Sequence, residues 1–156
     1  MRTSIVPTMA VCLSLVPLAL ARAEQPGAHV EYIGGTRPDI PANEKGSLHA
    51  ADEQYLVFYA KHSAVRVSYD RINLLEYGQK VDRRYALAVF VSPVFALSKK
   101  RQHFLTVGYL DEKGKEQAIV FKVEKDDIRT ILVSLEARTG RKVEFQDEEA
   151  RKAGRG

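Results

Sequence analysis

The fold is set by residues 103–140, HFLTVGYLDEKGKEQAIVFKVEKDDIRTILVSLEARTG, in which a strand period gives way to a helix period. Apolar side chains occupy every second position in 105–109 and again in 119–123, the pattern of strands with one buried face. A polar segment, 111–115, separates the two runs and carries Gly114, which can adopt the positive φ that a tight turn needs. The pattern therefore predicts a β-hairpin.

A helix period begins directly after the hairpin. Apolar residues fall at i, i+3, i+4 and i+7, which places them on one stripe of a helix that faces a core. They are Ile128, Ile131, Leu132 and Leu135. Asp126 is the expected N-cap, and Gly140 is the expected residue at which the helix ends in a left-handed turn. We therefore expect one C-terminal amphipathic helix.

Short apolar runs earlier in the chain predict further strands. Residues 55–59 read Tyr-Leu-Val-Phe-Tyr, which is rich in the aromatic and branched residues that strands prefer. Alternating apolar positions return in 65–69, after a polar turn at 61–63. The remaining strand candidates are 30–33, 47–50, 72–77 and 143–145. The chain is therefore expected to be mainly β, with one helix at its C-terminal end.

Residues 1–23 have the profile of a secretory signal peptide. Arg2 gives a positive start, 5–20 is mostly apolar, and Ala21-Arg22-Ala23 offers a small-x-small cleavage pattern. An uncleaved membrane anchor is the alternative, although the apolar run is short for a full span. Cleavage would remove Arg2 and Arg22, lower the formal charge from +4 to +2, and remove the only cysteine. We therefore expect a periplasmic or extracellular domain that has no disulfide and does not bind nucleic acid.

The sharpest anomaly in the sequence is 85–98, an almost wholly apolar run with Pro93 in its middle and basic residues on both sides. It is too short to cross a bilayer as a helix, and Pro93 would break one. Two interpretations stay open: a buried strand that bends at the proline, or an apolar loop that enters a membrane interface or a partner groove. The candidate membrane or partner surface consists of Arg83, Arg84, Phe90, Val91, Val94, Phe95, Lys99, Lys100 and Arg101.

Several segments of the chain carry a resemblance to a known fold family. They are Gly46-Ser47-Leu48, Tyr55-Leu56-Val57-Phe58, Val67-Ser68-Tyr69-Asp70-Arg71-Ile72, Leu75-Glu76-Tyr77-Gly78, the final hairpin, and the helix that ends at Gly140. Together they resemble pleckstrin-homology-like domains, including small bacterial GRAM-like domains. The resemblance implies a partly open β-barrel of about seven strands capped by the helix, and a scaffold that binds lipid headgroups, peptides or partner domains. The first hairpin loop, 61–63, has one basic residue, so phosphoinositide binding is not expected.

The expected organisation follows from these elements. A signal peptide (1–23) precedes an irregular segment (24–45), in which Gly34-Gly35 and two prolines interrupt regular structure. The pleckstrin-homology-like domain occupies 46–140, and 141–156 forms a short strand and a charged tail that frays. The opening Tyr-Ile-Gly-Gly-Thr at 32–36 is also similar to the start of a group of small secreted bacterial proteins.

No catalytic, cofactor-binding or metal-ligating residues are predicted. The histidines His29, His49, His62 and His103 have no ligand spacing, and no nucleophile elbow, phosphate-binding loop or dinucleotide fingerprint is present. Asp70-Arg71 is expected to be a structural turn between strands. We therefore expect a non-enzymatic exported binding module that meets a protein partner or an anionic membrane through 85–101. The alternative is a self-associating structural subunit of the cell envelope.

Overall fold

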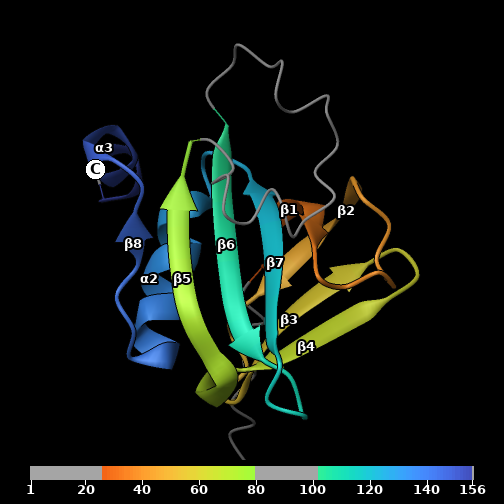
Figure 1. The fold of residues 1–156 in the computed structure, drawn as a ribbon. Helices are drawn as coiled ribbons and strands as arrows, with labels where there is room; N and C mark the ends of the chain where they lie inside the picture. Colours follow the sequence, from red (N-terminus) through yellow and green to blue (C-terminus); the bar gives the residue numbers. More distant parts are fainter. Residues whose placement is uncertain (1–25, 80–101, 156) are drawn as a thin grey trace, which may run out of the picture.

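The computed structural model describes residues 26–79 and 102–155, and these residues form a mainly β fold with two helices near the C-terminus (Figure 1). The prediction of a mainly β fold is therefore confirmed, whereas the expectation of a single helix is wrong. The strands are β1 (Ala28–Gly35), β2 (Glu44–His49), β3 (Tyr55–Ala60), β4 (Ala64–Ser68), β5 (Ile72–Gly78), β6 (His103–Leu110), β7 (Glu116–Val123) and β8 (Glu144–Phe145). The helices are α2 (Ile128–Thr139) and α3 (Glu148–Arg155), and the 3₁₀ turn η1 (Tyr69–Arg71) joins β4 to β5.

The strands form one open eight-stranded sheet in the order β4-β3-β2-β1-β7-β6-β5-β8. Two antiparallel meanders, β1 to β4 and β5 to β7, are joined where β1 pairs with β7. Figure 1 shows the first meander crossing obliquely behind the second, with both helices on the side of β5. Because β4 and β8 lie at opposite edges and are not paired with each other, the sheet is not closed.

The expected irregular segment at 24–45 requires a correction. The strand predicted there extends from Ala28 to Gly35 and lies in the middle of the sheet, between β2 and β7. Gly34 does not end it, because the pairing with β7 shifts register between Tyr32 and Gly34 and then continues to Gly35. A register shift of this kind lets a strand bend without leaving the sheet. The sheet therefore includes residues that the sequence analysis placed outside the domain.

The predicted fraying tail at 141–156 is also corrected, because residues 148–155 form α3. The Ala150 N–H donates to Asp147 Oδ1 at 2.6 Å, which ties down the first turn of this helix. Ala150 is completely buried and Gly154 is also buried, so one face of the short helix lies against the domain. Phe145, just before α3, packs edge-on against Tyr77 with ring centroids 5.9 Å apart.

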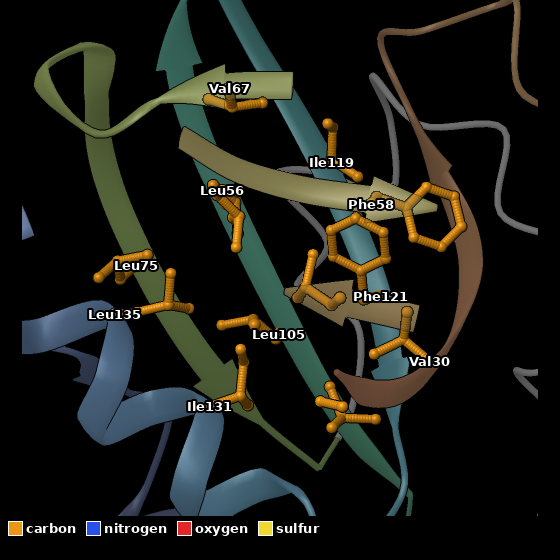
Figure 2. Close-up of a cluster of buried hydrophobic side chains, with 14 of the residues drawn as sticks. Val30, Leu56, Phe58, Val67, Leu75, Leu105, Ile119, Phe121, Ile131 and Leu135 are labelled. Carbon is orange, nitrogen blue, oxygen red and sulfur yellow. The ribbon is translucent and has the colours of Figure 1, made fainter. Parts of the chain in front are cut away.

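The amphipathic helix is confirmed: its predicted apolar stripe is the buried face of α2. In Figure 2, Ile131 and Leu135 reach from α2 toward Leu75 on β5 and Leu105 on β6. The helix ends as predicted, since Gly140 has φ 68° and its N–H donates to the Glu136 carbonyl.

The predicted N-cap of α2, Asp126, is wrong. The residue before the helix is Asp127, whose carboxylate makes no capping bond to the helix. It accepts a hydrogen bond from the His29 N–H at 2.7 Å instead. The acidic side chain therefore ties the start of α2 to β1.

Candidate functional site

A cleft of about 570 Å³ lies beside the open edge of the sheet. The outer edge strand β4, the turn η1, the end of the β6–β7 hairpin and the segment after β1 all contribute to its walls. Its lining includes Arg37, Arg66 and Arg71, with the aromatic rings of Tyr55 and Tyr109. The lining also holds the acidic side chains of Asp111 and Glu112. Guanidinium groups are over-represented where proteins bind carboxylates and phosphates.

The local structure of β4 and η1 directs Arg66 and Arg71 toward the cleft. On β4 the residues alternate, with Val65 and Val67 buried and Arg66 exposed between them. Arg71 is the last residue of η1 and is also exposed. The two guanidinium groups therefore reach the cleft from neighbouring elements. Within 26–79 and 102–155, no acidic side chain forms an ion pair with either of them.

Arg37 differs from the other two arginines because its charge is already matched. Its Nε and Nη2 donate to the two carboxylate oxygens of Asp39 at 2.8 and 2.7 Å. These hydrogen bonds are the main reason that the pKa of Arg37 lies above its ordinary value and that of Asp39 below it. The Tyr32 hydroxyl donates to the Arg37 carbonyl at 3.1 Å and holds the backbone. Arg37 is therefore held in place in the wall of the cleft, with its charge paired to Asp39.

Tyr109 supplies the least expected feature of the cleft. The residue is 5% exposed and contributes to the lining of the cleft. Its hydroxyl is buried and has no hydrogen-bond partner among the described residues. The hydroxyl is close enough to Arg37 to contribute to the raised pKa of that guanidinium, but it is outside hydrogen-bond geometry. An unpaired buried hydroxyl costs about 1–3 kcal/mol, so a bound acceptor at this point would be stabilised.

The acidic side chain at the hairpin end has a structural role. The Asp111 carboxylate accepts the N–H groups of Lys115 and Lys113 at 2.9 and 2.8 Å, and the side-chain amide of Gln117 at 3.1 Å. These bonds, the one from Lys115 first, lower the pKa of Asp111 below its ordinary value. Gly114 completes the predicted turn with φ 75°. Asp111 therefore shapes the turn. Besides Asp111, the charged lining residues that form no ion pair within 26–79 and 102–155 are Arg66, Arg71 and Glu112.

Outside the cleft, His103 and Tyr77 form a second polar pair. The Tyr77 hydroxyl is hydrogen-bonded to Nδ1 of His103, and the two rings are stacked with centroids 6.0 Å apart. Burial, and then the charge of Lys125, lower the pKa of His103, while Glu124 opposes them. His103 is therefore partly buried and held by Tyr77.

We expect the free energy of unfolding to fall as the pH drops below 6.5, the ordinary pKa of histidine. The folded pKa of His103 is lowered, so the unfolded chain takes up the proton first and protonation favours unfolding. His103→Gln should flatten this fall between pH 7 and 5, whereas His62→Gln in the exposed turn should not. Urea titrations across this range measure the effect, and equal slopes for both variants would contradict it.

Histidine and carboxylate groups do not gather into a larger site in the described ranges. His29 Nδ1 lies 2.9 Å from Asp127 Oδ2, a pair that the sequence analysis missed because the residues are far apart in the chain. In 26–79 and 102–155 no group of three or more His, Cys, Asp or Glu side chains is placed to hold a metal ion.

The surface predicted from the sequence lies outside the described residues. This holds for the whole 85–98 run, its flanking residues Arg83 and Arg84, and Lys99, Lys100 and Arg101. Among the helices of the described ranges, none is long and apolar enough to cross a membrane.

The cleft itself was not predicted. Its residues come from four separate segments, and of its arginines only Arg71 had been singled out, as part of the expected turn Asp70-Arg71. That turn is present as η1, and no ion pair within the described part of the chain involves either residue. No pattern in the sequence signals which arginines and tyrosines the topology brings together. In comparisons with known proteins, the chain matches no protein-family model and no curated protein.

Proposed function

We propose that this chain is a non-enzymatic binding module that holds an anionic group, a carboxylate or a phosphate, in the cleft beside β4. The observation that carries the proposal is the buried hydroxyl of Tyr109, which has no hydrogen-bond partner within 26–79 and 102–155 and belongs to a residue that lines the same cleft as Arg66 and Arg71. A bound anion would accept from the hydroxyl and from both guanidinium groups, and hydrogen bonds to charged groups are the stronger kind.

The overall architecture supports a module of the pleckstrin-homology-like type. The first seven strands form two meanders that meet at β1 and β7, and α2 buries its apolar stripe against the core. In such scaffolds the sheet holds its shape while loops and edges meet the ligand. We include export in the proposal because of the leader pattern in 1–23. Contact with a membrane or a partner through 85–101 stays a separate prediction.

The proposal is tested by titrating the ¹⁵N-labelled protein with inorganic phosphate and with glutarate at constant ionic strength. A single anionic group engages few atoms, so we expect a dissociation constant on the order of millimolar. Saturable shifts should appear at the Arg66 and Arg71 side chains and at the backbone of Tyr109. Shifts that are absent, or that are spread evenly over the surface and do not saturate, would overturn the proposal.

A further inference from the structure

The pairing of β4 shows which of its backbone groups are used. Residues of an antiparallel strand direct their N–H and C=O groups alternately to the two sides. Just past one end of β4, the Tyr69 N–H donates to the Gln54 carbonyl at 3.0 Å. Just before the other end, the Ser63 carbonyl accepts from the Ala60 N–H at 2.8 Å. The odd-numbered residues of this strand therefore face β3.

The even-numbered residues face the opposite side. Ala64, Arg66 and Ser68 direct their N–H and C=O groups away from β3, where no described strand pairs with β4. The β3 side agrees with this assignment: the Tyr55 N–H, opposite Ser68, donates to Asp52 Oδ1 at 2.9 Å and not to β4. The outer edge of β4 is thus a row of backbone groups that another extended chain can pair with.

Side chains beside this edge suit a peptide ligand. Tyr55 and Tyr59 on β3 are 38% and 45% exposed, and they lie opposite Ser68 and Ala64. Arg66 projects from the same face of the sheet between them, because alternate residues share a face. Tyrosine and arginine are among the residues enriched at the centres of binding interfaces.

We propose that the free edge of β4 pairs with an extended acidic segment of a partner protein, which places one carboxylate in the cleft. The inference rests on the proposed function and names its ligand class. The positive charge beside this edge favours an acidic ligand. An acidic strand would place its side chains beside Arg66, with Arg71 at the end of the edge. A second copy of β4, paired antiparallel about its centre, would place Arg66 opposite Arg66, and like charges directly opposite are unfavourable.

Ser68→Pro tests the backbone pairing with little disturbance of the fold. Ser68 has φ −65°, the value that proline imposes, and its N–H faces the free edge, where proline is tolerated in sheets. Ser68→Ala is the matched control, since it removes the same hydroxyl and keeps the N–H. The probe is a blocked peptide of four Glu-Thr repeats, which presents its carboxylates on one face when extended. Its Gln-Thr counterpart serves as the neutral control.

We expect Ser68→Pro to weaken binding of the Glu-Thr peptide about tenfold, because a backbone hydrogen bond is lost and the ring blocks close approach. Ser68→Ala should bind as the wild type does, and phosphate should bind to both variants equally. Unchanged peptide binding by a folded Ser68→Pro variant, with phosphate binding intact, would overturn edge pairing and leave the proposed function standing. Failure of phosphate to bind the wild type would instead overturn the proposed function.

Two further measurements keep the inference testable. If Ser68→Pro does not fold, a Glu-Thr peptide that is N-methylated at alternate residues is titrated into the wild-type protein, and unchanged affinity for both methylation patterns would contradict pairing. Sedimentation of the free protein tests whether a second copy of the chain occupies the edge. A dimer that forms with rising concentration and is lost in Ser68→Pro would show that the edge belongs to a second copy, and would overturn the acidic peptide.

Discussion

Phe121→Ala is expected to lower the free energy of unfolding by about 3–5 kcal/mol, the range observed when a buried phenylalanine is truncated. Phe121 is 1% exposed. Its ring lies 5.1 Å from that of Phe58 on β3 and 6.3 Å, edge-on, from that of Tyr32 on β1. Figure 2 shows the ring between the two meanders, beside Phe58 and Val30. The substitution therefore removes ring contacts between the two halves of the sheet, in addition to the backbone pairing of β1 with β7 that it leaves in place.

Val133→Ala is the matched control for this prediction. Val133 lies on α2 but is 64% exposed, so its truncation should change stability by less than about 0.5 kcal/mol. Urea unfolding followed by circular dichroism measures both variants. A Phe121→Ala variant that loses less than about 1 kcal/mol would show that the two meanders do not share one core through this ring.

Replacing both free arginines of the cleft is expected to abolish measurable anion binding. Each charge-assisted hydrogen bond contributes about 1.5–3 kcal/mol, so Arg66→Gln with Arg71→Gln should raise the dissociation constant for phosphate by well over tenfold. Neither side chain forms an ion pair within the described ranges, so stability should stay within about 0.5 kcal/mol of the wild type. The measurement is the phosphate titration, repeated on the double variant.

One control variant distinguishes phosphate binding in the cleft from attraction by the overall charge of the protein. Arg129→Gln removes an exposed arginine from α2, which is not part of the cleft lining, and should leave phosphate binding unchanged. If Arg129→Gln weakens binding as much as the cleft substitutions do, phosphate is held by the overall charge of the protein and the cleft is not the site.

Local periodicity was sufficient to predict much of the fold. The hairpin of β6 and β7, the turn at Gly114 and the buried stripe of α2 each depend on residues within a few positions of one another. These patterns report which face of an element is buried, and that is decided locally. The same sequence could not show that β1 lies in the middle of the sheet, because its place depends on pairing with β7, far along the chain.

The two remaining errors have a common cause. The tail was expected to fray because it is highly charged, yet Ala150 and Gly154 give α3 one buried face only one turn long. Asp126 was expected to be the N-cap of α2, but the neighbouring Asp127 is bound by His29 from a distant strand. In both cases a tertiary contact outweighs the local preference. The cleft is the clearest example of a feature set by tertiary structure, since Arg66, Arg71 and Tyr109 are brought together only by the topology of the sheet.

The central claim is that the Tyr109 hydroxyl is kept for a ligand, and Tyr109→Phe tests it most directly. Stability and phosphate affinity are measured on the same variant. Since the hydroxyl has no partner among the described residues, its removal should leave the free energy of unfolding unchanged or raise it by up to about 1 kcal/mol. Phosphate binding should weaken roughly five- to tenfold, the value of one hydrogen bond. A variant that is clearly less stable but binds phosphate as the wild type does would show that the hydroxyl serves the fold, and would contradict the account.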